Sequence, residues 1–384
     1  MAGLSGHVLP IHPQPKEDEI FSSWLCRIAQ ANGLKLHTLE VQIWGRKKQI
    51  WTRDIDRSID EETIAMVAKL AGTSLDRAKE TCLRGLEGKL FERLVVKTNS
   101  DWVLPLGVYH RKRRRPAMQF CPLCLAHDEL PYYRRSWRLA LSTFCTVHDT
   151  MLHECCPKCQ APVMFHRQEL GDRWTSKIAS FTLCTSCGYD LVLAPVSPAP
   201  ILEHGAWTAL KRQRMALNTG WFAEDAVTFQ YSHLYFVVLR NLMQKMRGRW
   251  STSRLLAFIV QRFGVELPTS RRFNEPFEFF GVYDRHLFLQ GATWYLQDWP
   301  DRFISVCRDL KVRYSEVMRE FSPVPYWFLK EASHLEFKPL GPSTGELVAM
   351  RQLLEQCKNP KQMKILRKSI KQRTANGSIL KLLN

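Results

Sequence analysis

Cysteine and histidine residues in the middle of the chain occur in pairs whose spacing suits a metal ion. Each pair has two residues between its members, and the pairs are Cys121 and Cys124, Cys145 and His148, Cys156 and Cys159, and Cys184 and Cys187. Two intervening residues let one tight turn direct both side chains onto one ion. Taken in order, the pairs form one set of three cysteines and a histidine and one set of four cysteines. Both sets are closed tetrahedral combinations, so the sequence predicts two structural Zn²⁺ ions.

Three further possible metal donors adjoin these pairs, so the identity of individual ligands is not decided by spacing alone. His127 follows the first pair, and His153 and Cys155 lie just before Cys156. Any of them in place of a paired residue would leave the number of ligands unchanged. We prefer the pairs because of their regular spacing.

Catalytic chemistry is not indicated by these residues. Zinc deaminases combine a His-x-Glu motif with a Pro-Cys-x-x-Cys pair and keep one coordination position open. Here Glu154 follows His153 directly, and Pro157 lies inside a cysteine pair. The sequence also lacks a Gly-x-x-x-x-Gly-Lys phosphate loop, an HExxH helix and a GxSxG elbow. We therefore expect no enzyme active site.

The composition is that of a folded protein of a reducing compartment. The chain has 384 residues, 45% of them hydrophobic, which is enough apolar material for two or three modest cores. No stretch approaches the length of a membrane span, and the first residues lack the apolar region of a signal peptide. We expect a cytoplasmic protein without a membrane partner, in which twelve cysteines favour metal over disulfides.

An excess of basic residues predicts a polyanionic partner. Lys and Arg number 55 against 37 Asp and Glu, which gives a formal net charge of +18. One basic run occupies 111–115, and the lysines of 361–371 recur at intervals that would align them on one side of a helix. A solvated surface is the alternative explanation for each cluster. The predicted nucleic-acid contacts are Arg111, Lys112, Arg113, Arg114, Arg115, Lys361, Lys364, Lys368 and Lys371.

Hydrophobic periodicity predicts helices on both sides of the cysteine region. Residues 17–34 contain a helical pattern that stops at Asn32-Gly33. Two helices at about 61–71 and 75–84 have the outline of a helix-turn-helix, and an ordinary αα-hairpin is the alternative. In the C-terminal half, the same spacing recurs in 253–264, 285–310 and 344–357.

These patterns predict a mainly α fold with small zinc-ribbon or zinc-finger β elements. Pro195, Pro198 and Pro200 predict an extended linker. We expect an N-terminal helical domain with the helix-turn-helix-like hairpin, a tandem zinc-binding region, and a C-terminal helical domain with a basic tail, over residues 1–115, 116–195 and 196–384.

The cysteine region also resembles the TniQ/TnsD family of transposon target-selection proteins. That family shares a Cys-Pro-x-Cys pair, a segment with tyrosine, arginine and tryptophan, a Cys-x-x-His pair, a leucine and a second Cys-Pro-x-Cys pair. The matching positions are Cys121, Cys124, Tyr133, Arg134, Trp137, Cys145, His148, Leu152, Cys156 and Cys159. The family's opening helix is matched by an acidic residue followed by Ser23, Trp24, Arg27, Ala29, Asn32 and Gly33. The resemblance covers about 16–190 and, in length, is closest to TniQ.

What the resemblance implies is a transposition accessory factor of bacterial origin. Such a protein acts as an adaptor that links target DNA, or an RNA-guided CRISPR effector complex, to an AAA+ regulator ATPase. The partners expected on this basis are that ATPase, target DNA, the effector complex and a second copy of the chain in a homodimer.

Two other functions stay open at this point. A site-specific DNA-binding target selector of the TnsD type would read a target sequence directly, which requires side chains inserted in a groove. An unrelated zinc-ribbon transcription factor would share the cysteine pairs but not the N-terminal helix pattern.

Overall fold

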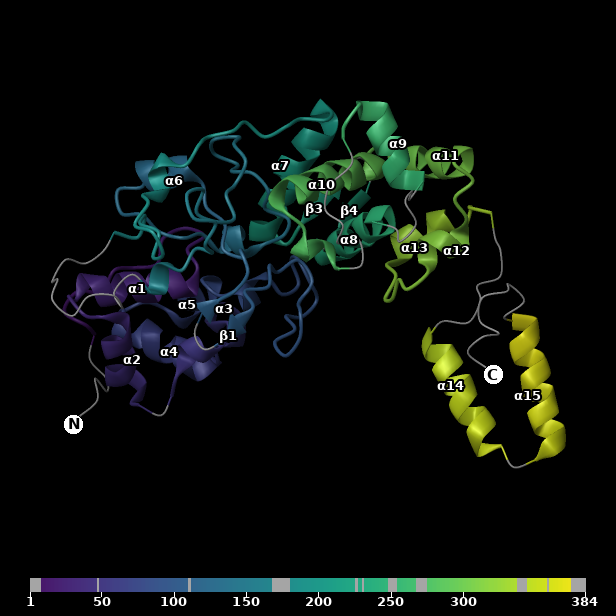
Figure 1. The fold of residues 1–384 in the computed structure, drawn as a ribbon, viewed down its shortest axis with the longest axis horizontal. Coiled ribbons are helices and arrows are strands. Elements are labelled where there is room, and N and C mark those ends of the chain that lie inside the picture. The colour runs from purple at the N-terminus through teal and green to yellow at the C-terminus, as the bar shows by residue number, and fades with distance from the viewer. Residues whose placement is uncertain are drawn as a thin grey trace. The chain divides into compact units, whose positions relative to one another are not determined.

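Helices dominate the structure (Figure 1). The computed structural model describes residues 8–46, 48–109, 112–167, 180–224, 227–229, 231–247, 254–266, 275–336, 344–357 and 359–373. The α-helices are α1 (Phe21–Ala31), α2 (Leu36–Trp44), α3 (Ile55–Ser58), α4 (Glu61–Leu70), α5 (Leu75–Glu80), α6 (Pro122–His127), α7 (His204–Thr219), α8 (His233–Arg247), α9 (Arg254–Phe263), α10 (Val282–Leu296), α11 (Asp301–Asp309), α12 (Tyr314–Met318), α13 (Tyr326–Ala332), α14 (Thr344–Gln356) and α15 (Pro360–Arg373). The predicted mainly α fold class is confirmed.

The strands of the described residues form two small antiparallel pairs. Strand β1 (Val108–Tyr109) pairs with β2 (Lys112–Arg113), and β3 (Phe222–Glu224) pairs with β4 (Val227–Phe229) with Phe222 opposite Phe229. Short 3₁₀ turns complete the fold at η1 (Ile50–Thr52), η2 (Leu83–Leu86), η3 (Arg135–Arg138), η4 (Phe165–Arg167), η5 (Leu191–Leu193) and η6 (Phe277–Phe279). None of the helices that the structure describes combines the length and hydropathy that a bilayer crossing needs.

The helix boundaries follow local signals in the sequence. Helix α1 ends at Asn32, and Gly33 has a φ of +63°, a conformation that glycine adopts without a Cβ clash. Asp60 caps α4, its carboxylate accepting the Thr63 amide at 2.7 Å, and Ser74 caps α5. The second helix of the predicted pair ends at Glu80, earlier than expected, because the chain continues from Cys82 as the 3₁₀ turn η2.

The chain divides into two compact units, residues 1–297 and 298–384. The boundaries predicted at 115/116 and 195/196 fall inside the first unit, and the three-domain division stays a prediction. The proline segment is extended, as expected, but it is bonded to the cysteine region. The Ala199 amide donates to the Asp149 carbonyl at 2.9 Å, and the Met151 amide donates to the Ser197 carbonyl at 2.9 Å.

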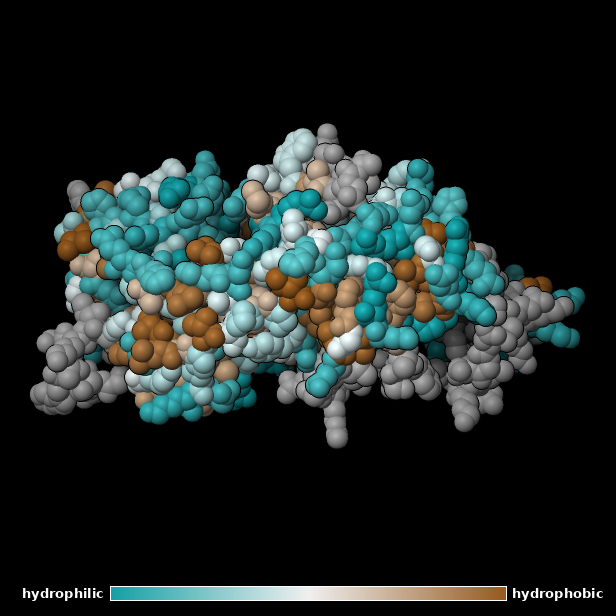
Figure 2. Space-filling model, turned by 90° about the horizontal axis from the view of Figure 1, so that it is seen from above, coloured by the Kyte–Doolittle hydropathy of each residue, from teal (hydrophilic) through white to brown (hydrophobic). Residues whose placement is uncertain are grey.

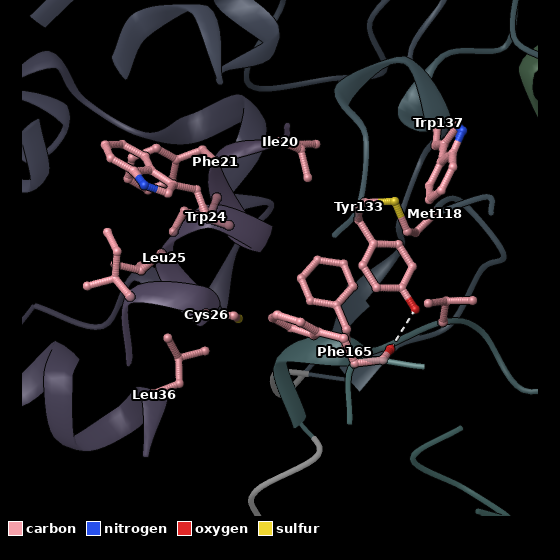
Figure 3. Close-up of a cluster of buried hydrophobic side chains, with 14 of the residues drawn as sticks. Ile20, Phe21, Trp24, Leu25, Cys26, Leu36, Met118, Tyr133, Trp137 and Phe165 are labelled. Carbon is pink, nitrogen blue, oxygen red and sulfur yellow. Dashed lines mark hydrogen bonds between the residues drawn. The ribbon is translucent and has the colours of Figure 1, made fainter. Parts of the chain in front are cut away.

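The N-terminal helices and the cysteine region share one hydrophobic core in the first unit. Ile20, Phe21 and Trp24 of the first helical segment are fully buried in it. From the other side, Tyr133 stacks on Phe165 with ring centroids 4.3 Å apart, and its hydroxyl donates to the Phe181 carbonyl (Figure 3). Burial of large aromatic side chains from both segments therefore stabilises them as one body.

A buried ion pair holds the start of α1 against the segment around Tyr133. Arg27 Nε and Nη2 donate to the two carboxylate oxygens of Glu19 at 2.8 and 2.6 Å. Ser23 Oγ donates to Glu19 Oε1 and accepts the Tyr133 amide, both at about 3 Å. The motif residues at 23, 24 and 27 thus have structural roles, since Trp24 Nε1 also donates to the Pro13 carbonyl at 2.8 Å.

A second buried network joins α3 to η3. The Arg138 guanidinium is fully buried and pairs with Asp54 at 2.7 Å and Asp56 at 3.1 Å. Burial by itself would raise the pKa of Asp54, but the charge and hydrogen bonds of Arg138, together with the charges of Arg57 and Arg113, outweigh burial and lower that pKa. The Asp56 carboxylate in turn accepts the Ser22 amide at 2.9 Å, which ties this network to α1.

Helices α7, α8, α9 and α10, with the β3–β4 pair and η6, follow the cysteine region in the first unit. Helix α10 is buried around most of its circumference and packs on α7 and α8. A Cβ at Gly291 would lie 2.7 Å from Met246 Cε and 3.2 Å from Ile259 Cγ2, so glycine lets these side chains pack close to the α10 backbone. Arg285 on α10 pairs with Glu154 of the cysteine region, and the other Glu154 oxygen accepts the Val282 amide at 2.7 Å.

The second unit has its own aromatic cluster. Trp299 and Phe328 stack with ring centroids 5.4 Å apart, and Phe303 and Phe321 lie against the Phe328 ring. Helices α14 and α15 contact each other as a hairpin, and no described side chain of theirs is buried.

His286 on α10 gives a test of the packing in the first unit. Its Nε2 lies 2.9 Å from the Pro200 carbonyl and its Nδ1 lies 2.8 Å from Thr143 Oγ1, so a neutral ring satisfies both partners. Burial lowers the pKa of His286 to about 4. Since an unfolded histidine titrates near 6.5, the unfolded chain binds the extra proton, and this group removes stability as the pH falls from about 6.5 towards 4.

We therefore predict that His286→Gln reduces the pH dependence of unfolding. The free energy of unfolding of the unmodified protein should fall faster than that of the variant, by up to about 1.4 kcal/mol per pH unit in that window. Urea titrations at pH 7, 6 and 5 measure the difference, and parallel pH profiles would contradict the prediction.

Candidate metal centres

The first predicted ligand set comes together beside the start of α6. The Sγ atoms of Cys124 and Cys145 lie 3.5 Å apart, and His148 Nδ1 lies 3.6, 3.4 and 3.5 Å from the sulfur atoms of Cys121, Cys124 and Cys145. A tetrahedral zinc site with bonds of about 2.3 Å to sulfur has ligand–ligand edges of about 3.5 to 3.8 Å. These four donors therefore have the separations that one bound ion needs.

The second ligand set has the same dimensions. Cys156 Sγ lies 3.7 Å from Cys187 Sγ, and Cys159 Sγ lies 3.6 Å from Cys184 Sγ. A disulfide would require about 2.05 Å. All four sulfur atoms lie within 4.8 Å of one another, so this group could also hold a metal ion.

Three of the four pairs are built on one repeated turn. The first cysteine of each turn, Cys145, Cys156 or Cys184, accepts an amide from four residues later and donates its own amide to a carbonyl five residues later, all at 2.8 to 3.0 Å. One residue further out on both sides, a single β-bridge closes the turn: Phe144 with Met151, Cys155 with Pro162, and Leu183 with Asp190.

The backbone conformation explains how these turns close. The residue four positions after the cysteine has positive φ in each turn, +50° at Asp149, +58° at Gln160 and +69° at Gly188. Asp, Asn, Gln and Gly tolerate this left-handed region to different degrees, and glycine tolerates it best. The remaining pair is different, because Cys121 caps α6 and Pro122 occupies the first helical position.

The two centres differ in exposure to solvent. In the first, all three cysteines are buried, whereas in the second Cys159 is exposed and Cys187 is partly exposed. Hydrogen bonds from the Cys124 and Cys145 thiols hold the pKa of Cys121 far below its usual value. The Tyr189 amide donates to the Cys187 sulfur and contributes most to lowering the pKa of that thiol to about 7. In the same sets, neighbouring thiols and burial raise the pKa values of Cys124, Cys145, Cys159 and Cys184, so the thiols of each set share protons that a bound metal would displace.

The three alternative donors lie outside both groups. The His153 ring stacks on Phe120, and its Nε2 lies 2.7 Å from the Pro195 carbonyl. Cys155 Sγ lies 3.0 Å from Gln160 Oε1, and the His127 ring lies 5.4 Å from the His148 ring. The regular pairs are therefore the sets that the fold brings together.

The basic run at 111–115 is not a uniform surface. Arg111 lies outside the described residues, and Lys112, Arg114 and Arg115 are exposed. Arg113 is only 6% exposed, its guanidinium lies over the Phe165 ring, and it donates to the Val163 carbonyl. The alternation of side chains along β2 places Arg113 in the core, unlike its exposed neighbours, and the nucleic-acid contacts of the run stay a prediction.

The predicted tail helix is confirmed as α15, which contains all four lysines of the pattern. Lys361 and Lys364 are exposed, and the side chains of Lys368 and Lys371 lie outside the described residues. Whether this face contacts nucleic acid stays a prediction.

In the helix-turn-helix-like hairpin, the two basic residues of α5 bond to other groups of the protein. Arg77 of α5 donates to the Pro15 carbonyl, and Lys79 pairs with Glu61 at 2.6 Å. Helix α5 is six residues long. A short helix whose cations are already paired offers few side chains for reading bases.

Sequence reasoning missed the residues that attach the metal region to its neighbours. Glu154 was examined only as a catalytic acid, whereas it pairs with Arg285, 131 positions away. The sequence shows only that Glu154 is a charged residue next to a cysteine pair. That position does not indicate that its partner is Arg285.

Residues 10–152 match the TniQ family model, so the chain carries a TniQ family domain over 143 of its 384 residues. No curated protein matches the chain. The matched range contains the complete first ligand set and none of the second. TniQ family proteins are non-catalytic transposition accessory proteins, and the domain implies a transposition-associated target-selection protein.

We predict two metal equivalents per chain in protein purified without chelator. Cys121→Ser should lose one equivalent together with most of the soluble protein, because metal binding by such sites is coupled to folding and contributes roughly 10 to 16 kcal/mol in finger peptides. Cys155→Ser is the matched control and should keep both. Elemental analysis that finds fewer than two equivalents in the unmodified protein would contradict the assignment.

Proposed function

We propose that the protein is a target-site selection adaptor of DNA transposition. In this role it links target DNA, or an RNA-guided CRISPR effector complex, to an AAA+ regulator ATPase. The observation that carries the proposal is the TniQ family domain over residues 10–152.

The metal centres are proposed to be structural zinc sites. The donors are Cys121, Cys124, Cys145 and His148 in one and Cys156, Cys159, Cys184 and Cys187 in the other. Sulfur-rich sets with four protein ligands suit zinc and leave no open position for substrate. Their role would be to fix the turns that carry Tyr133 and Glu154 against the helices.

An adaptor is favoured over a direct reader of DNA sequence by the state of the hairpin. Arg77 and Lys79, the cations of α5, are held by Pro15 and Glu61. Contacts to phosphates give affinity without sequence information, whereas base contacts give specificity. Exposed cations of the basic run, Lys112, Arg114 and Arg115, suit phosphate contacts.

Exposed apolar side chains next to the first metal centre support protein partners. Val147 and Met215 are 74% and 70% exposed and line the same cavity of about 600 Å³. Figure 2 shows one face of the molecule, on which apolar residues reach the surface in patches between hydrophilic ones. Apolar surface rimmed by polar groups is typical of interaction sites.

Co-purification tests the adaptor role. The tagged protein, expressed with the other proteins of the element that encodes it, should retain an AAA+ ATPase or an RNA-guided effector complex. Cys155→Ser should retain the same partners. A protein that retains neither, and that binds one DNA sequence with nanomolar affinity at physiological salt, would instead be a target selector of the TnsD type.

A second prediction concerns α15. Replacing Lys361, Lys364, Lys368 and Lys371 with Glu should reduce transposition, because a basic helix face would lose its attraction to nucleic acid or to an acidic partner. The matched control replaces four exposed basic residues of the first unit, Lys35, Arg46, Lys69 and Arg84, with Glu. Metal content and melting temperature should not change in either variant. Equal transposition frequencies in the two variants would show that α15 has no special role.

A further inference from the structure

A cleft on the first unit gathers cations from distant parts of the chain. It has a volume of about 730 Å³, and its walls come from residues 52–58, 96–108, Arg115 and Phe279. The first wall runs from η1 into α3, and the others belong to the loop before β1, the end of the basic run and η6. The hairpin α4–α5 contributes no side chain to it.

The cleft is strongly positive. Arg53, Arg57, Lys97 and Arg115 line it, against Asp54 as the one carboxylate among the described residues there. Both Asp54 oxygens are occupied by the Arg138 guanidinium, at 3.1 and 2.7 Å. The four cations of the cleft are therefore not neutralised by its own acidic residue.

Two of these cations are held in place. The Arg57 guanidinium donates to the carbonyls of Val95, Val96 and Thr98, which fixes it along the loop. Arg115 lies with its guanidinium 4.2 Å from the Phe279 ring centroid. Its aliphatic part runs across Gly107, where a Cβ would lie 3.2 Å from Arg115 Cγ and where φ is +57°. Glycine at 107 thus makes room for this arginine.

The other two cations are available to a ligand. Arg53 and Lys97 are exposed, and neither has a carboxylate within ion-pair distance among the described residues. The Nε atom of Arg57 is buried without a hydrogen-bond acceptor. Arg57 and Arg115 are held in position, and Arg53 and Lys97 can move to meet a ligand. Such a group of cations suits an anion with several charged oxygen atoms.

We propose that this cleft binds the phosphate backbone of duplex DNA. The proposal rests on the proposed function, since it identifies where the adaptor would touch its DNA. Recognition of single strands usually needs exposed aromatic side chains on which bases stack. The one aromatic ring of the cleft, Phe279, is covered by Arg115, so the site is equipped for phosphates and not for bases.

The test compares two variants of the full chain that lose the same charge. The cleft variant carries Arg53→Ala, Lys97→Ala and Arg115→Ala, and the control carries Lys35→Ala, Arg46→Ala and Lys69→Ala, three exposed residues that line neither this cleft nor the cavity beside the first metal centre. Fluorescence anisotropy with a labelled 30-base-pair duplex of arbitrary sequence, over a series of NaCl concentrations, measures the slope of log affinity against log salt. Each lost phosphate contact should flatten that slope by about 0.9.

We expect the cleft variant to flatten the slope by about 2 to 3 and the control by less than 1. Equal slopes in the two variants, or no duplex binding by the unmodified protein, would overturn the proposal. Tighter binding of a single-stranded RNA than of the duplex, with the same sensitivity to the cleft variant, would overturn the assignment to DNA, and equal displacement by polyglutamate would point to an acidic protein. None of these outcomes depends on co-purification of an ATPase or effector complex, so the adaptor role is judged separately.

Discussion

The arrangement of the first unit depends on two sets of four ligand atoms that have to stay within a few ångströms of one another. Between 114 and 203, the described chain contains one α-helix, α6, and otherwise short turns and isolated bridges. Such a stretch lacks the continuous backbone hydrogen bonding of a long helix or a sheet, although many of its side chains, such as Tyr133 and Phe144, are buried. A shared ion in each set would replace the cooperativity that a helix or sheet otherwise supplies. Side chains of this region that are not ligands, such as Tyr133 and Glu154, would then hold their positions against neighbouring helices.

Three buried ionic groups join the resulting parts. Glu19 with Arg27, Asp54 and Asp56 with Arg138, and Glu154 with Arg285 each cross between segments that are distant in sequence or fix the start of a helix. Removing one partner of such a group leaves an uncompensated charge in the interior, so these residues are constrained as sets. The motif residues that the family shares therefore act mainly in the packing of the domain. Its partners have to be sought on the exposed surface.

Local patterns in the sequence predicted the helices and the ligand pairs, since hydrophobic spacing and a two-residue gap are properties of short windows. They did not predict the fate of Arg113, because whether a residue of a short strand points inward depends on what covers it, here Phe165. The proline segment read as a linker, whereas its carbonyl and amide groups pair with residues near Asp149. The cationic cleft was equally out of reach, because its members meet only after the loop before β1 and η6 come together.

The unequal burial of the two cysteine clusters makes them unequally sensitive to oxidation. Oxidants and electrophiles react first with accessible thiolates. A site that loses one ligand sulfur in this way holds its metal ion less tightly. Cys159 is exposed, whereas Cys121, Cys124 and Cys145 are buried. Under oxidative stress the second cluster would fail before the first, and the half of the core that contains α1 would outlast the half that contains Phe181. Loss of metal would then begin at the second cluster, where Cys159 is exposed and Cys187 is partly exposed with its pKa lowered to about 7.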